Sequence, residues 1–202
     1  MGYQPDSKHI SSRIAEMVEK EIEYSLSLIE PRGIFKIFDV DRFKGIEVFK
    51  NADKVAFGIV TIGDKLEKEV SNLFKKGEGA KALILDGIGS AAAEFTANLL
   101  NRKINNRAKK LGYRASKRFS PGYVNWLVEN QDIIFNSFEG TERKIGVRLT
   151  SSKMMVPLKS VSFAVNLGEN TIKEVNPEQC SSCSLREKCL NVNQPACSIN
   201  RD

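Results

Sequence analysis

Residue types suited to holding a small charged ligand gather in one segment, Arg118-Phe119-Ser120-Pro121-Gly122-Tyr123. Pro121 fixes one backbone dihedral of a turn and Gly122 can adopt a positive φ, so a rigid loop presents Arg118 and Tyr123 to the same small volume. A guanidinium fork binds a carboxylate or phosphate in bidentate fashion. Gly122 leaves bare main chain for a ligand, and Tyr123 adds a flat ring and a hydroxyl. The segment predicts a site for a small zwitterion; the alternative is a solvated arginine beside an ordinary loop.

A second group of reactive side chains lies near the end of the sequence, where all four cysteines occur: Cys180, Cys183, Cys189 and Cys197. Clustered thiols in a cytoplasmic chain hold a metal or cluster more often than they form disulfides. Four thiolates suit zinc or an iron-sulfur cluster, although the spacing differs from common zinc ribbons and bacterial ferredoxins. We predict a metal or cluster site here, with free thiols or disulfides as the alternative.

Histidine chemistry is nearly absent, because His9 is the single histidine of the sequence. It lies at the start of the first amphipathic stretch. A buried Ser/His/Asp triad or a multi-histidine metal centre therefore has no residues to form it, which excludes most hydrolase mechanisms.

The elements that must position these groups begin with an amphipathic helix over residues 10–29, where apolar side chains recur every three or four positions. Residues 34–40, 46–49 and 54–62 are β-branched and aromatic runs between polar residues, which predicts three strands. Asp64 is a good N-cap for a short helix that ends at about Lys76.

A long helix is predicted over residues 80–110, since Ile84, Ile88, Ala91, Phe95 and Leu99 keep a helical spacing. The same region spells a dinucleotide-binding fingerprint, G-x-G-x-x-A, from position 87 to position 92. The acidic residue expected about 20 positions later is missing, and the helical period continues through both glycines. We therefore favour the helix, with close packing or a ligand as the reason for its glycines.

Beyond the long helix, we expect a short helix from Asn125 to Phe138 and strands over residues 144–149 and 161–167. This order of elements predicts an α+β fold, a mainly antiparallel sheet with long helices packed on it and a small cysteine-rich C-terminal tail. We place the domain boundary near residue 170, with a folded domain over residues 1–170 and the tail over residues 171–202.

The composition of the sequence limits the class of protein and the kinds of partner to be considered. The sequence has 202 residues, 41% of them hydrophobic and 28% charged, as in an ordinary folded protein. No apolar run approaches the ~20 residues that cross a bilayer and no signal peptide is visible, so we expect a soluble cytoplasmic protein with no membrane partner. The net charge of +6 would suit nucleic acid, an acidic protein or an anionic ligand. A basic zinc-binding nucleic-acid module is thus a rival, but bases and acids mostly alternate and no nucleic-acid motif appears.

Three stretches together resemble a known family. They are the Arg118 to Tyr123 segment, residues 146–157 (GVRLTSSKMMVP) and residues 159–162 (KSVS), and the helix segment from Asp86 to Leu100 also fits. Over about residues 80–168 the sequence resembles the activation (reactivation) domain of cobalamin-dependent methionine synthase, and in particular its short free-standing relatives.

This resemblance implies a site for S-adenosylmethionine (AdoMet). Arg118 would contact the methionine carboxylate, and the loop Ser120, Pro121, Gly122 and Tyr123 would line the pocket. Glu94 would lie near the ligand and receive its ammonium group or a bridging water; the alternative for Glu94 is a solvent-facing helix acid. For Arg148 we favour a plain structural pairing with an acid.

The resemblance also implies a function, reactivation of a cobalamin-dependent methyltransferase by reductive methylation of cob(II)alamin, with the cobalamin carried by the partner subunit. A flavodoxin or ferredoxin would supply the electron, and a cluster in the tail could relay it. No general base is needed, because cob(I)alamin is itself the nucleophile. Two features of the long family members, an N-terminal acidic residue and aromatic residues of a late strand, have no counterpart here. A corrinoid-system scaffold that does not use AdoMet is therefore an alternative.

Overall fold

A computed structural model describes residues 12–123 and 126–169, whose chain forms two interleaved compact units. Of the described residues, the first unit combines 12–34, 59–100 and 140–161, and the second combines 35–58, 101–123, 126–139 and 162–169. In the described ranges we find no helix with the length and apolar character needed to cross a membrane.

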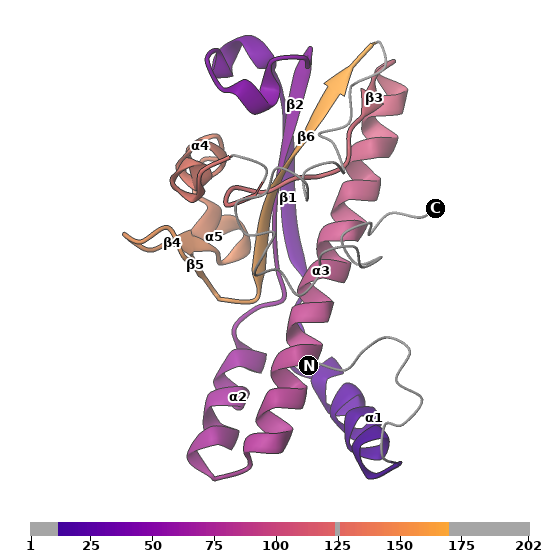
Figure 1. The fold of residues 1–202 in the computed structure, drawn as a ribbon, viewed down its shortest axis with the longest axis vertical. Helices are drawn as coiled ribbons and strands as arrows, with labels where there is room; N and C mark the ends of the chain where they lie inside the picture. Colours follow the sequence, from indigo (N-terminus) through magenta and orange to yellow (C-terminus); the bar gives the residue numbers. More distant parts are fainter. Residues whose placement is uncertain (1–11, 124–125, 170–202) are drawn as a thin grey trace, which may run out of the picture. The chain divides into compact units, whose positions relative to one another are not determined.

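The main sheet has four strands in the order β1-β2-β6-β3 (Figure 1). Their bounds are Arg32–Asp39 for β1, Lys54–Thr61 for β2, Arg114–Ala115 for β3 and Ser160–Gly168 for β6. β3 runs antiparallel to β6. A separate antiparallel pair joins β4 (Arg148–Leu149) to β5 (Met155–Val156). The α+β class with antiparallel pairing is confirmed, as are the strands predicted over residues 34–40, 54–62 and 161–167.

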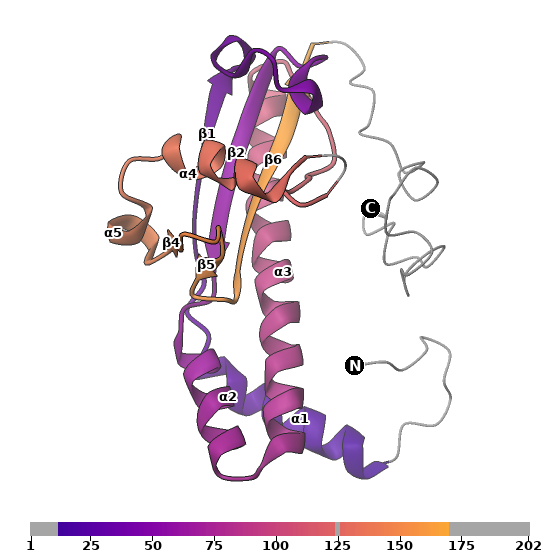
Figure 2. The same ribbon diagram turned by 60° about the vertical axis from the view of Figure 1, so that its left-hand side comes forward.

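Three helices make up most of the first unit: α1 (Ser12–Leu26), α2 (Lys65–Lys75) and the part of α3 (Gly79–Lys110) that precedes Asn101 (Figure 2). They enclose an apolar core of Ile62, Leu66, Val70, Leu73, Ala82, Leu85 and Ala93, against which Leu28, Ile29, Ala92 and Val161 pack. α1 contributes little to this burial, because Ser25 is its one buried residue.

The predicted long helix is confirmed, because α3 runs without interruption through both glycines of the dinucleotide-like spelling. A dinucleotide fingerprint needs a strand, a turn and a helix start at that point, so this interpretation does not hold. Gly89 has a packing role instead: a Cβ built on it would lie 2.6 Å from Cδ2 of Leu66.

The second unit is built around an aromatic cluster of Phe38, Phe43, Phe49, Phe57, Phe119 and Trp126. Within it, the centroids of neighbouring rings are 5.0 to 6.1 Å apart. Such edge and tilted contacts add to the large apolar area that each ring buries. The short helices η1 (Val40–Phe43), η2 (Glu47–Phe49), η3 (Val128–Asn130) and α4 (Gln131–Asn136) belong to the same unit.

Three predicted elements differ in the structure. The strand expected over residues 46–49 is wrong: Glu47–Phe49 form the 3-10 helix η2. The Phe49 amide donates a hydrogen bond to the Ile46 carbonyl at 3.0 Å, and the Phe49 ring packs into the aromatic cluster. Residues 144–149 were expected as one strand. They instead finish α5 (Thr141–Ile145) and then form β4, because Gly146 with φ of 75° ends the helix. The helix expected up to Phe138 comprises η3 and α4 and ends at Asn136.

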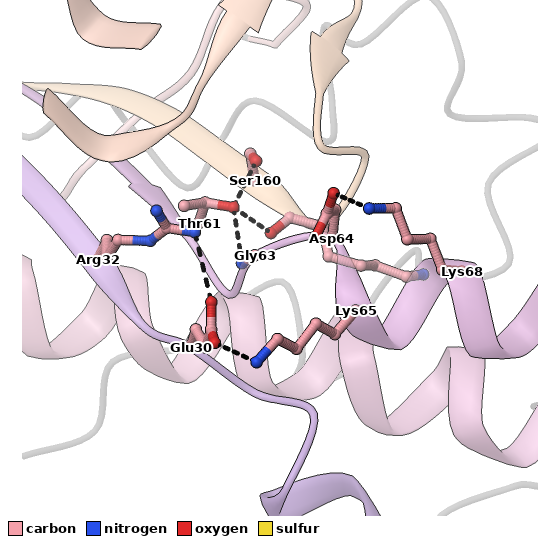
Figure 3. Close-up of polar contacts among 9 residues, drawn as sticks. Glu30, Arg32, Thr61, Gly63, Asp64, Lys65, Lys68 and Ser160 are labelled. Carbon is pink, nitrogen blue, oxygen red and sulfur yellow. Dashed lines mark hydrogen bonds and ion pairs between the residues drawn. The ribbon is translucent and has the colours of Figure 1, made fainter. Parts of the chain in front are cut away.

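A polar cluster joins three segments of the first unit (Figure 3). Its centre is the buried hydroxyl of Thr61. This hydroxyl accepts a hydrogen bond from the Gly63 amide at 3.1 Å and another from the Ser160 hydroxyl at 3.0 Å. Ion pairs of 2.5 Å, Glu30 with Lys65 and Asp64 with Lys68, flank this centre. Asp64 occupies the predicted N-cap position of α2, but its carboxylate pairs with Lys68 and makes no capping bond.

Candidate functional site

The predicted turn in the Arg118 to Tyr123 segment is present. The Tyr123 amide donates to the Ser120 carbonyl at 3.2 Å, with Pro121 second and Gly122 third in the turn. Gly122 has φ of +91°, which places it in the left-handed region that the third position of a type II turn requires. The Gly122 amide donates a hydrogen bond to the Trp126 carbonyl at 2.7 Å, and the Trp126 amide donates one to the Tyr123 carbonyl at 2.9 Å. The loop is therefore fixed at both of its ends.

The turn is also anchored from below. Phe119 exchanges two backbone hydrogen bonds with Ala164 of β6, at 3.0 and 2.8 Å. Pro121 is buried, and the Phe119 and Trp126 rings lie 5.5 Å apart within the aromatic cluster. Because these anchors are buried while the tip is exposed, the tip is presented on a rigid base, as a preorganised binding loop requires.

Of the residues expected to meet a ligand, Gly122 and Tyr123 are exposed and Arg118 is half-buried. Tyr123 is 70% exposed. A Cβ built on Gly122 would meet only Cβ of Val128, at 3.9 Å, so the main chain there is open to a ligand. Arg118 is half-buried, with its guanidinium carbon 5.7 Å from the ring centroid of Phe163. A guanidinium fork, an open glycine and an exposed ring thus belong to one short loop, and this arrangement suits a ligand that carries a carboxylate.

Glu94 and Arg148, the other residues that the sequence analysis considered, lie outside the Arg118 to Tyr123 segment. Glu94 is exposed on α3 and belongs to the first unit, whereas Arg118 belongs to the second, so the role of Glu94 stays a prediction. Arg148 lies at the start of β4 with Nε 3.7 Å from the Glu142 carboxylate. The structural pairing that we favoured for Arg148 is therefore present.

The four cysteines, Cys180, Cys183, Cys189 and Cys197, lie outside the described residues, as does His9. Across residues 12–123 and 126–169, no group of three or more His, Cys, Asp or Glu side chains could hold a metal ion. The metal or cluster site stays a prediction for the tail.

Sequence reasoning missed Phe163, the ring beneath Arg118. The sequence signal for this contact was Gly58, which interrupts the run of apolar residues inside strand β2. A glycine inside a strand often marks a place where another group approaches closely. Here a Cβ on Gly58 would lie 2.6 Å from Cζ of Phe163.

Comparison with known proteins identifies the fold. No family model matches the chain, and no curated protein matches it. Several solved structures match, among them "Crystal Structure of the MetH Reactivation Domain bound to AdoHcy", with a TM-score of 0.62 and 15% identity. The match covers 100% of this chain and 83% of that chain. The chain has a reactivation-domain-like fold. At this identity the likeness shows the fold alone, which is the fold that the motif resemblance implied.

Proposed function

We propose that this protein binds AdoMet at the Ser120 to Tyr123 turn and reactivates a cobalamin-dependent methyltransferase, with methionine synthase as the expected client. The observation that carries the proposal is the rigid turn, which presents the open main chain of Gly122 and the exposed ring of Tyr123 in the same short segment as Arg118. The likeness to a reactivation domain that was solved with AdoHcy supports it.

The residues present fit such a ligand. The Arg118 fork would hold the carboxylate, and the absence of a side chain at Gly122 leaves room against the main chain. The exposed ring of Tyr123 offers a flat face, while Ser120 and Pro121 shape the turn. When bound, AdoMet supplies a methyl group on a good leaving group, so the protein needs to hold and orient it and requires no general base.

The same proposal gives the tail a role. Cys180, Cys183, Cys189 and Cys197 would hold an iron-sulfur cluster that relays an electron from a flavodoxin or ferredoxin. Metal analysis and visible absorption of the anaerobically purified full chain test this part. We expect iron with broad visible absorption; a colourless protein with stoichiometric zinc would reject the relay.

Calorimetric titration of the full chain with AdoMet and AdoHcy tests the binding step. We expect saturable binding, and a loss of about 10- to 100-fold for Arg118→Ala, because a charge-assisted bond is lost. Arg107→Ala, at an exposed arginine of the last turn of α3, is the matched control and should leave the affinity unchanged. Equal affinities for Arg118→Ala and the wild type would remove Arg118 from the site.

The reactivation step requires a cobalamin-binding methyltransferase in the cob(II)alamin state and a reductant. Transfer of radiolabelled methyl from AdoMet to the partner's cobalamin is the expected result. Recovery of the partner without label would favour the AdoMet-independent scaffold instead.

A further inference from the structure

We infer that Phe163 is a positioning residue for Arg118: its buried ring fixes the direction of the guanidinium, and Gly58 provides the space for that ring. The contact itself is a property of the second unit, which contains all three residues. Its consequence for ligand affinity rests on the proposed function.

The backbone pairing explains why the two side chains meet. Phe119 and Ala164 are direct partners across antiparallel segments. Side chains alternate between the faces of a sheet, so Arg118 and Phe163, each one position before a member of this pair, lie on the opposite face from Phe119. They are diagonal neighbours there, a separation within reach of long and aromatic side chains. The observed distance of 5.7 Å from the guanidinium carbon to the ring centroid agrees with this geometry.

The ring of Phe163 is itself held firmly. Phe163 is fully buried, and its edge lies against the Cα of Gly58, where a Cβ would be 2.6 Å from Cζ and 2.9 Å from Cε1. Any larger residue at position 58 would displace the ring. Gly58 therefore allows an aromatic platform under Arg118 that no other residue at that position would permit without a shift.

A fixed platform changes what the arginine can do. An arginine side chain on a surface samples many rotamers, and ordering it on binding lowers affinity. A guanidinium held over an aromatic ring is already oriented and partly desolvated, and both effects strengthen its bond to a carboxylate. Replacing Phe163 should therefore lower the affinity only for ligands that carry the carboxylate.

The contact can be tested without a ligand. In the wild type the Arg118 Nε–H proton should show an upfield NMR shift from the Phe163 ring current, with the resonance assigned by Arg118→Lys. Phe163→Leu should abolish the shift. Leu85→Ala, which truncates a fully buried side chain in the core of the first unit, should preserve it. An unshifted wild-type resonance, or a shift that survives Phe163→Leu, overturns the inference.

Affinity provides the second test, with AdoMet and decarboxylated AdoMet as probes. Phe163→Leu and Gly58→Ala should each weaken AdoMet about tenfold, while leaving decarboxylated AdoMet within about twofold, because cation–π stabilisation acts through Arg118. Leu85→Ala, in the core of the first unit, should change neither affinity. Equal losses for both probes would indicate a merely structural role and overturn the inference. Circular dichroism identifies folded variants, and Phe163→Met replaces Phe163→Leu if the latter does not fold.

The two proposals fail in different ways. A wild type that binds neither probe contradicts the proposed function, whereas the ring-current shift still decides whether Phe163 positions Arg118. A wild type that binds AdoMet but lacks the shift contradicts only the positioning role.

Discussion

Gly89 of α3 and Leu66 of α2 approach so closely that a Cβ at position 89 would lie 2.6 Å from Leu66 Cδ2. Leu66 is fully buried. A glycine inside a helix costs about 1 kcal/mol relative to alanine, and this contact is the structural reason for accepting that cost.

Gly89→Ala should therefore lower the free energy of unfolding by about 1 kcal/mol, because overpacking of about 1–3 kcal/mol exceeds the gain in helix propensity. Urea unfolding measures the change. In a Leu66→Ala background the same substitution should become stabilising. Gly79→Ala is the control, since its Cβ would meet only Phe74, at 3.9 Å. A more stable Gly89→Ala in the wild-type background would contradict this explanation.

The turn at Gly122 offers a test of backbone strain separate from packing. Its φ is +91°, yet a Cβ there would contact only Val128, at 3.9 Å. Gly122→Ala should lower the free energy of unfolding by about 1–2 kcal/mol through the left-handed backbone alone. Gly122→Asn should cost less, because asparagine tolerates that region better. Thermal or urea unfolding ranks the stabilities of the wild type and the two variants. An alanine variant as stable as the wild type would show that the turn has a different conformation.

The sequence could predict the period of α3 but not the face that it buries. Phe95 and Leu99, chosen for their apolar spacing, are 62% and 42% exposed, whereas Ala93 and Ala97 are buried. Hydrophobicity ranks phenylalanine above alanine, but close approach to a neighbouring element requires small residues. Which face is close to another element depends on tertiary packing, and the spacing along one helix carries no information about it.

The candidate site shows a similar division. The turn was predictable because Pro121 and Gly122 restrict the backbone locally. The support under Arg118 was not, since it comes from Phe163 and Gly58 on two strands distant in the sequence. The strand predicted over residues 46–49 was wrong for the same reason: a short run with three apolar residues fits a strand or a helical turn, and contacts of Phe49 decided between them.

Substitutions at Thr61 test how much the polar cluster of the first unit contributes to stability (Figure 3). Thr61→Val keeps the shape of the side chain but leaves the Gly63 amide without its acceptor. An unpaired buried donor costs about 1–3 kcal/mol, so the free energy of unfolding should fall by that amount. Thr61→Ser, which retains the hydroxyl, should lose less.

Thr96→Val is the matched control for this experiment. The Thr96 hydroxyl donates to the Ala92 carbonyl within α3, at 2.8 Å, so its removal leaves no amide donor unpaired. Thr96→Val should lower the free energy of unfolding, measured with urea, by clearly less than Thr61→Val does. Equal losses would mean that the Thr61 hydroxyl has no special role.

The pair formed by Asp39 and Lys54 predicts how stability depends on pH. Lys54 lowers the pKa of Asp39 below its ordinary value of 3.8, first by donating a hydrogen bond and second by its charge. The hydrogen bond to Asp39 in turn raises the pKa of Lys54 above 10.5. The carboxylate therefore contributes stability above its unfolded pKa, and this is lost as pH falls through the folded pKa. The ammonium contributes stability below 10.5, which is lost as pH rises through its folded pKa.

Asp39→Asn should therefore flatten both limbs of the stability curve, in acid below about pH 4 and in alkali above about pH 10. Asp39 is exposed and Lys54 is half-buried, so the effect should be small and should shrink in 1 M salt, where the Debye length is about 3 Å. Urea unfolding over a pH series measures it. Glu129→Gln, at an exposed carboxylate of η3, is the control and should leave the alkaline limb unchanged. If Asp39→Asn leaves both limbs as steep as in the wild type, the pair contributes nothing to stability in solution.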